Sequence, residues 1–159
     1  MNILAIDPGQ HTGLAFYMDD KIEATHAVRI VSQRGAQELR RLVQLAQRKG
    51  IERVVVESQY PRPGRAMQSL FGLAAYRGAV EQEARVLGMG VERVTPDEWK
   101  SGALRRLGIS RRAQPEDKAK GIRELAEKIA GSLLAVGASD DVADAVVLGH
   151  WFLFRGLYV

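Results

Sequence analysis

The pattern of apolar and polar positions predicts three short strands at the start of the chain. An apolar run at Asn2–Ile6 ends at an Asp-Pro-Gly turn signal, and strand-like runs follow at Thr12–Met18 and Lys21–Val28. Asp19 and Asp20 lie between the last two runs and mark a tight turn. Such short connections favour an antiparallel meander.

The middle of the chain alternates helical and strand patterns. Apolar residues recur at helical spacing over Arg34–Lys49, and Gly50 stands where a C-terminal cap belongs. The compact β-branched run Arg53–Val56 is typical of a strand buried on both faces. A loop over Ser58–Gly64 then leads into a long predicted helix, Arg65–Leu87.

The last part of the chain predicts one more strand and then helices. The strand Met89–Val94 is followed by Thr-Pro-Asp-Glu at positions 95–98, a capping-box pattern with proline at the first helical position. We expect the glycine- and arginine-rich stretch Ser101–Gln114, which follows that helix start, to be mobile. Helices are predicted over Pro115–Leu134 and from a capping Ser139 to about Phe154.

This order of elements predicts an α/β fold with a mixed five-stranded sheet and helices on both faces. The 159 residues form one predicted domain, 1–159, without internal repeats. No apolar run approaches the roughly 20 residues of a membrane span, and the N-terminus lacks the pattern of a signal peptide. We therefore expect a cytoplasmic protein without a membrane partner.

The charge distribution favours a nucleic-acid partner. The net charge is +4 and the sequence pI is about 9.6, and a basic balance suits a polyanion. A single basic run is more often a solvated face, but this chain has two, both near candidate catalytic acids. The first contains Lys100, Arg105, Arg106, Arg111 and Arg112, and the second contains Arg53, Arg62 and Arg65.

Four acidic residues occupy the ends of predicted elements and are candidate metal ligands. Asp7 closes the first strand, Glu57 closes the fourth, and Asp141 and Asp144 share one face of the first turn of the last helix. Carboxylates that converge at the carboxyl ends of strands repel one another unless cations are present. The chain has no cysteine, and an oxygen-only ligand set favours Mg²⁺ or Mn²⁺.

Each acid also has a structural alternative. Asp7 precedes Pro-Gly and could be a turn residue, and Asp140 and Asp141 could complement the helix dipole. We assign the dipole role to Asp140. Glu57 follows three valines and Asp144 lies in an apolar stretch, where an unpaired carboxylate is costly. The set of four, rather than any one acid, therefore predicts the metal site.

Such a site suits phosphoryl chemistry. Two divalent ions can activate water and stabilise both oxygens of an in-line displacement at phosphorus. Lys100 and Lys118 are candidates to meet the scissile phosphate, because lysine is a compact point charge. On charge alone, both could equally be surface lysines.

Five segments, in the right order along the chain, resemble the motifs of the RuvC family of Holliday junction resolvases. They are ILAIDPGQHTGLA at 3–15, RVVVESQY at 53–60, TPDEWK at 95–100, EDKAKGI at 116–122 and DDVADAVVLGHW at 140–151. The resemblance implies an RNase H-like fold, a homodimer, two Mg²⁺ ions (with Mn²⁺ as a substitute) and paired nicking of branched DNA, the four-way junction.

By this resemblance, individual residues acquire expected roles. Asp7, Glu57, Asp141 and Asp144 would be the metal ligands. Lys100 and Lys118 would face phosphate, Lys118 as a catalytic residue, and Tyr60 would stack on a base near the crossover. The helix Arg65–Leu87, with small residues at Gly72, Ala75 and Gly78, would form the dimer. The proline-rich loop 60–65 and the arginine-rich stretch 100–114 depart from the family pattern and concern junction selectivity rather than the metal site.

Three other functions are compatible with parts of the pattern. The same fold carries nucleases that cut RNA–DNA hybrids or other branched DNA, and the four acids do not separate these from a resolvase. The spacing Asp-x-Gly-x-x-x-Gly from Asp7 also opens sugar kinases and actin-like ATPases, which need a second phosphate motif and more chain than 159 residues provide. A junction-binding module without nuclease activity is disfavoured by the four intact acids.

Overall fold

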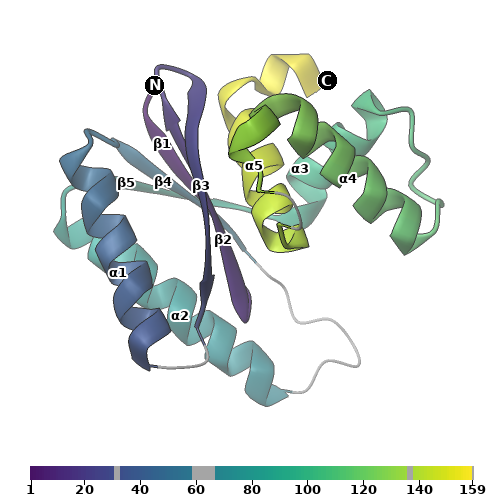
Figure 1. The fold of residues 1–159 in the computed structure, drawn as a ribbon. Helices are drawn as coiled ribbons and strands as arrows, with labels where there is room; N and C mark the ends of the chain where they lie inside the picture. The colour runs from purple at the N-terminus through teal and green to yellow at the C-terminus, as the bar shows by residue number, and fades with distance from the viewer. Residues whose placement is uncertain (31–32, 59–66, 136–137, 159) are drawn as a thin grey trace.

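The structure is a computed structural model that describes residues 1–30, 33–58, 67–135 and 138–158. Within these ranges five strands form one sheet, and two helices lie on one face and three on the other (Figure 1). The strands are β1 (Ile3–Asp7), β2 (His11–Met18), β3 (Lys21–Arg29), β4 (Arg53–Glu57) and β5 (Gly90–Val94). The helices are α1 (Gln33–Arg48), α2 (Met67–Val86), α3 (Pro96–Arg106), α4 (Pro115–Ala130) and α5 (Asp140–Leu153).

The sheet is mixed, as the sequence predicts. Its strand order is β3-β2-β1-β4-β5. β1 pairs antiparallel with β2 and β2 antiparallel with β3, which forms the meander. β4 runs parallel to β1 and β5 parallel to β4. The carboxyl ends of β1, β4 and β5 therefore meet at one edge of the sheet.

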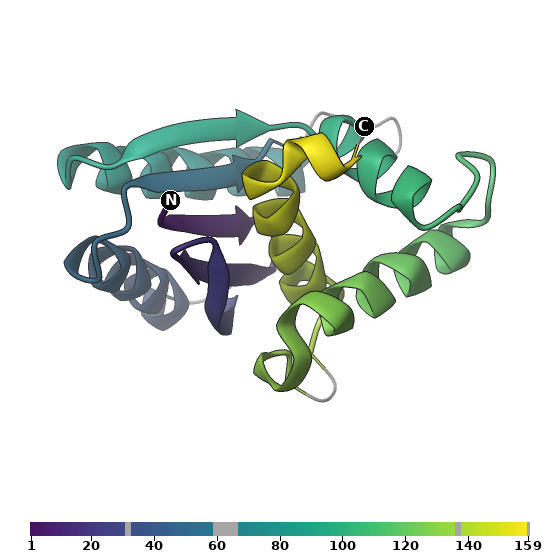
Figure 2. The same cartoon turned by 90° about the horizontal axis from the view of Figure 1, so that it is seen from above.

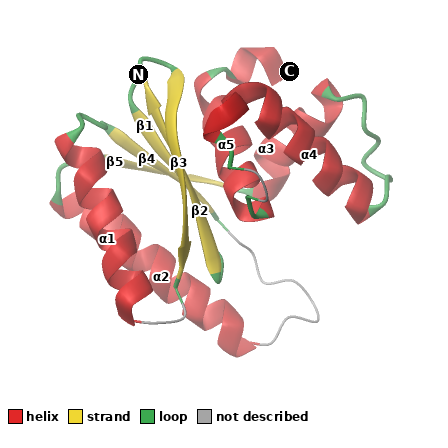
Figure 3. Cartoon of the chain, in the orientation of Figure 1, coloured by secondary structure: helices red, strands yellow, loops and turns green. Residues whose placement is uncertain are grey.

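Alternating side chains of the strands build a separate core on each face of the sheet. Ile3, Ala5 and Val55 pack with α3, α4 and α5. Leu4 and Val54 point to the opposite face and pack with α1 and α2. All five side chains are fully buried, as expected for central strands covered on both sides. Figure 3 shows α1 and α2 on one side of the strands and α3, α4 and α5 on the other, and the view from above shows α3, α4 and α5 together beside the sheet (Figure 2).

Helix α5 packs closely on the sheet because two glycines remove side chains from the contact. A Cβ at Gly13 would lie 2.0 Å from the carbonyl oxygen of Asp141, and one at Gly149 would lie 2.4 Å from the ring of Tyr17. The Tyr17 hydroxyl donates a hydrogen bond of 2.6 Å to the Val146 carbonyl oxygen. These contacts fix where the first turn of α5, with its acidic residues, meets the sheet.

The structure corrects three predictions on element bounds and caps. Helix α3 continues to Arg106, so the first part of Ser101–Gln114 is helical, because Ala103 and Leu104 pack into the buried core. Helix α4 ends at Ala130 and a 3₁₀ turn follows over Gly131–Leu133. Ser139 precedes α5, but its side chain makes no capping hydrogen bond.

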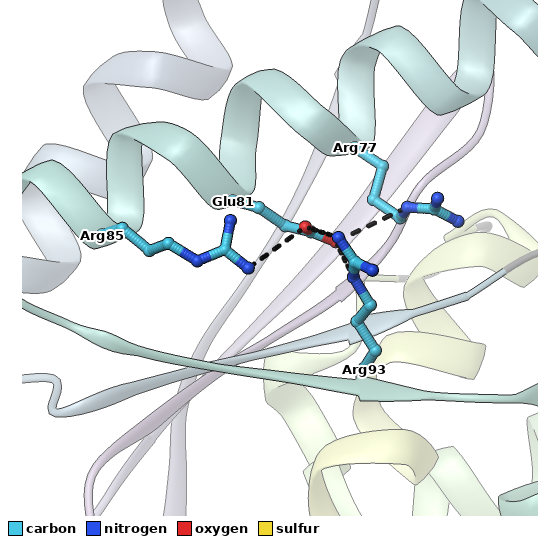
Figure 4. Close-up of polar contacts among 4 residues, drawn as sticks. All are labelled: Arg77, Glu81, Arg85 and Arg93. Atoms are coloured by element: carbon cyan, nitrogen blue, oxygen red, sulfur yellow. Dashed lines mark hydrogen bonds and ion pairs between the residues drawn. The ribbon is translucent and has the colours of Figure 1, made fainter.

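The structure contains a buried charge cluster around Glu81 that the sequence analysis did not predict. Glu81 of α2 has a side chain that is only 1% exposed, and three arginines surround its carboxylate (Figure 4). Arg93 of β5 binds it through two hydrogen bonds of 2.9 and 2.5 Å. Arg77 and Arg85, one turn before and after Glu81 on α2, each lie 3.5 Å away. This cluster joins α2 to the edge strand β5.

No described helix is both long enough and apolar enough to cross a bilayer.

Candidate active site

The sheet brings the first two predicted ligands together. Asp7 is the last residue of β1 and Glu57 the last of β4, and the parallel register pairs Ile6 with Val56 just before them. Both carboxylates therefore stand at the same edge of the sheet, on neighbouring strands. Each of the two residues is only 4% exposed.

Helix α5 supplies the other two acids. Asp141 and Asp144 lie one turn apart at the start of the helix. The Asp141 Oδ1 atom lies 3.4 Å from the position that a Cβ on Gly9 would take, so this carboxylate adjoins the loop that follows Asp7. The Thr12 hydroxyl donates to the Gly9 carbonyl oxygen at 3.1 Å and braces that loop.

Electrostatic effects on the pKa values indicate that the acids lie near one another. Burial raises the pKa of Asp7 well above its ordinary value, and the nearby charges of Glu57, Asp144 and Asp141 raise it further. Burial also raises the pKa of Asp144 and of Asp141. Asp7 Oδ1 is a buried oxygen with no hydrogen-bond partner among the described residues. The raised pKa values of these acids therefore indicate a surplus of negative charge.

Lys100 lies within ion-pair distance of two of these acids. Its Nζ lies 2.6 Å from Asp144 Oδ2 and 3.9 Å from Glu57 Oε2. Burial lowers its pKa, but the charges of Asp144 and Glu57 outweigh this and hold the pKa of Lys100 above its usual value. The ammonium thus links α3 and α5 across the site.

Trp99 is a site residue that sequence reasoning missed. Its indole Nε1 donates a hydrogen bond of 2.8 Å to Glu57 Oε2, and Lys100 Nζ lies 4.9 Å from the centre of its ring. The signal available in the sequence was that Trp99 directly precedes the candidate Lys100. Its helix also starts just after Val94, the strand residue that pairs with Glu57. A tryptophan at that place is indistinguishable by pattern from an ordinary core residue.

The residues present fit a hard divalent cation. All four candidate ligands offer carboxylate oxygens, and one of these oxygens is buried without a hydrogen-bond donor among the described residues. Within those same residues, no three histidine or acidic side chains already surround one point as metal ligands do. The Lys100 ammonium instead lies between the carboxylates of Asp144 and Glu57.

The other predicted lysine lies elsewhere. The Lys118 ammonium donates a hydrogen bond of 2.6 Å to the carbonyl oxygen of Arg111, which ties the start of α4 to the preceding loop. The structure does not pair Lys118 with any of the four acids, and Lys100 rather than Lys118 is the lysine that lowers the pKa values of Asp7, Asp141 and Asp144. A role for Lys118 at the phosphate stays a prediction.

The predicted DNA-binding arginines fall into two groups. Arg105, Arg111 and Arg112 are exposed and form no ion pair with any described carboxylate. Arg106 is also exposed, but its guanidinium lies 5.0 Å from the centre of the Tyr158 ring, beside a cavity of about 610 Å³ between the β2–β3 turn and helices α3, α4 and α5. None of the four acids lines that cavity.

Tyr60, Arg62 and Arg65 lie outside the described residues, so their predicted roles stay predictions. The structure agrees with the role assigned to Asp140. This side chain is 68% exposed and pairs with Arg123 at 2.7 Å, on the outside of α5.

Comparison with solved structures identifies the fold. RuvC of Thermus thermophilus in complex with a Holliday junction substrate is 21% identical, covers 98% of this chain and 94% of its own, and gives a TM-score of 0.71. Another structure of Thermus thermophilus RuvC gives a TM-score of 0.68 at 20% identity, covering 98% of this chain and 95% of its own. The Fowlpox virus resolvase bound to Holliday junction DNA gives a TM-score of 0.63 at 14% identity, covering 99% of both chains.

These likenesses extend over nearly the whole chain and confirm the predicted fold, which is that of RuvC. No protein-family model matches the sequence, and no curated protein is a significant relative of it. At such low identity the comparison establishes the architecture only.

Proposed function

We propose that this protein is a divalent-metal-dependent endonuclease that resolves four-way DNA junctions by paired hydrolysis of phosphodiester bonds. The observation that supports the proposal is that four carboxylates, at the ends of β1 and β4 and at the start of α5, lie near one edge of a RuvC-like sheet. Two of the similar structures contain Holliday junction DNA, which supports branched DNA as the substrate class.

The carboxylates of Asp7, Glu57, Asp141 and Asp144 would hold two Mg²⁺ ions, and Mn²⁺ would substitute. When bound, the ions supply the positive charge that polarises the phosphate and the attacking water. Asp7 and Glu57 contribute ligands fixed on central strands, which limits their movement. Lys100 is the described cation beside these ligands, and we assign it to the scissile phosphate.

The exposed arginines would bind the phosphate backbone around this site. Arg105 and Arg106 end α3, while Arg111 and Arg112 lie between α3 and α4. Because no described carboxylate pairs with Arg105, Arg111 or Arg112, their guanidinium groups keep their donors available for phosphate oxygens.

We further propose that the protein acts as a homodimer through α2, since two symmetric nicks need two active sites related by a two-fold axis. On the described part of this helix Ala75, Gly78, Ala79 and Gln82 are exposed, and Val86 is 71% exposed. A Cβ added at Gly78 would meet nothing within 4 Å. Gly78→Glu should therefore weaken the dimer in sedimentation while the equally charged Gln47→Glu on α1 should not. A wild-type protein that stays monomeric at micromolar concentration and still makes paired nicks would overturn the dimer.

The central experiment compares a labelled four-way junction, a plain duplex and an RNA–DNA hybrid, each with Mg²⁺, Mn²⁺ or a chelator. We expect paired symmetric nicks in the junction, only with a divalent ion. Preferential cleavage of the hybrid would favour the alternative RNase H-like activity. Cleavage in the presence of chelator would contradict the metal site.

A further inference from the structure

The contact between Trp99 and Glu57 is a specific arrangement inside the proposed site. Trp99 is 0% exposed, and its Nε1 lies 2.8 Å from Glu57 Oε2. A buried indole needs an acceptor for its N–H group. Here the acceptor is a carboxylate that the proposed function uses as a metal ligand.

The backbone fixes the relation between the two side chains. Glu57 pairs with Val94 in the register of β4 and β5, and the Ser58 amide donates to the Val94 carbonyl oxygen at 2.7 Å. The chain then enters α3 through the Thr95–Glu98 capping box, which stabilises the first turn of a helix. The indole is thus held on a helix that starts directly beside the strand end carrying Glu57.

An indole suits this position better than a charged group would. The indole N–H donates but does not accept, and each carboxylate oxygen has two lone pairs. Glu57 Oε2 can therefore keep this hydrogen bond and still coordinate an ion. The indole is also neutral, so it orients the carboxylate without cancelling the negative charge that attracts cations.

We propose that Trp99 is a positioning residue for Glu57, which holds the carboxylate in the orientation that binds a divalent ion. This positioning role rests on the proposed function in one respect, the assignment of Glu57 as a metal ligand. Lys100, the next residue on α3, bridges to Asp144 at 2.6 Å, so one turn of α3 contacts ligands from both β4 and α5.

The first test measures Mn²⁺ affinity directly, by the loss of the free-ion signal in electron paramagnetic resonance. Trp99→Phe keeps an aromatic ring in the core and removes only the N–H donor and part of the bulk. We expect its Mn²⁺ affinity to fall about 10–100-fold, the range typical of groups that orient metal ligands. Trp151→Phe is the matched control, because Trp151 is the chain's other tryptophan and contacts Arg155 rather than an acid.

Cleavage assays separate positioning from general damage. In Trp99→Phe the Mg²⁺ concentration for half-maximal cleavage should rise by the same factor, while the rate at saturating Mg²⁺ should stay within a few-fold of wild type. Circular dichroism of both tryptophan variants checks that they fold. Equal Mn²⁺ affinities of Trp99→Phe and Trp151→Phe would overturn the proposal.

A second test does not change Trp99 and so does not depend on tolerance of its replacement. In the Trp151→Phe protein Trp99 is the only tryptophan, and its emission should change saturably as Mg²⁺ is added. Glu57→Gln in the same background should remove that change. If the protein binds Mg²⁺ but the Trp99 emission stays constant, the proposed role of Trp99 in positioning Glu57 is overturned.

The two proposals can fail separately. Weaker Mn²⁺ binding by Trp99→Phe in a protein that cuts no nucleic acid would leave the positioning role standing and overturn the nuclease. Metal-dependent junction cleavage with unchanged metal affinity in Trp99→Phe would support the nuclease and overturn the positioning role. No Mn²⁺ binding by the wild-type protein would overturn both.

Discussion

Two regions of the molecule bury carboxylates and balance their charge in opposite ways. At Glu81, one buried carboxylate lies within 3.5 Å of three guanidinium groups (Figure 4). At the carboxyl edge of the sheet, four carboxylates lie near one another, and the Lys100 ammonium forms ion pairs with two of them, Asp144 and Glu57. The first region holds more fixed positive charge than its acid requires, and the second holds less.

The pKa shifts report this difference. Burial opposes ionisation of Glu81, but the hydrogen bonds and charges of Arg93, Arg77 and Arg85 prevail and lower the pKa of Glu81 below its ordinary value. Burial raises the pKa of Asp7, and neighbouring acids raise it further. The negative charge of a carboxylate held by fixed cations is already balanced by side chains of the protein. A group of carboxylates without enough fixed cations is poised to bind mobile ones.

The largest expected effect separates the two regions by activity. Asp7→Asn should reduce junction cleavage by about 100-fold or more, because it removes a ligand, whereas loss of groups that merely orient ligands already costs about 10–100-fold. Junction binding should remain, since the basic surface binds the DNA. Glu57→Gln, Asp141→Asn and Asp144→Asn should behave in the same way. Near wild-type nicking by Asp7→Asn would show that the acids do not form the catalytic site.

The next effect contrasts the arginines of α3 and of the segment that follows it with the arginines of α1. Replacement of Arg105, Arg106, Arg111 and Arg112 by glutamine should weaken junction binding and flatten its dependence on salt. The slope should fall by about 0.9 for each phosphate that the variant no longer neutralises. The control replaces Arg34, Arg40, Arg41 and Arg48 on α1, which changes the net charge equally. Identical salt dependences of binding for the two quadruple variants would show that the first four arginines are only a solvated surface and do not bind the DNA backbone.

Stability should change in opposite directions when each region loses a charge. Glu81→Gln should lower the free energy of unfolding by about 1–3 kcal/mol, because it breaks charged hydrogen bonds whose arginine partners are partly exposed. Asp7→Asn should raise the stability of the metal-free protein by about 1–2 kcal/mol, because it removes a repelled, buried carboxylate. Urea unfolding in the presence of chelator measures both. A stabilising Glu81→Gln would break the contrast.

The pH dependence of stability should also differ in sign. The pKa of Asp7 is raised on folding, so its contribution is fully present below the unfolded value of about 4 and is lost as pH rises through the folded pKa. The pKa of Glu81 is lowered, so its contribution is present above about 4.3 and is lost as pH falls through the folded pKa. Relative to wild type, Asp7→Asn should therefore gain stability with rising pH and Glu81→Gln should lose it. Parallel curves for the two variants would contradict these assignments.

The smallest effect is expected outside both regions. Asp140→Asn should leave cleavage unchanged and alter stability by less than about 1 kcal/mol, because Asp140 is an exposed complement to the helix dipole. Asp141→Asn is the adjacent control. Equal loss of cleavage in both variants would show that the wrong acid of the pair was assigned to the metal.

The sequence could predict the sheet and the positions of the acids because both follow from local patterns. Alternating apolar runs set the strands, and Asp7 and Glu57 stand directly after two of them. The spacing of Asp141 and Asp144 places them on one helical face. The parallel pairing of β1 with β4 then brings the acids together.

The contacts across the sheet could not be predicted in the same way. Glu81 is one of two glutamates on the predicted helix and has no distinguishing local pattern, and only the packing of α2 against β5 places Arg93 beside it. Trp99 reads as a core residue until the register of β4 and β5 sets it against Glu57. The hydrogen bond from Lys118 to the Arg111 carbonyl oxygen likewise depends on the loop before α4, and the role of Lys118 at the phosphate stays a prediction.

The most direct test of the central claim is thermal unfolding at about pH 7 with and without a divalent ion. The account predicts that Mg²⁺ stabilises the wild-type protein, by about 2.7 kcal/mol at a hundredfold excess over its dissociation constant. Glu81→Gln should gain as much from Mg²⁺ despite its lower starting stability, and Asp7→Asn should gain little or nothing. A full Mg²⁺ effect in Asp7→Asn would contradict the claim that the four carboxylates form the cation site.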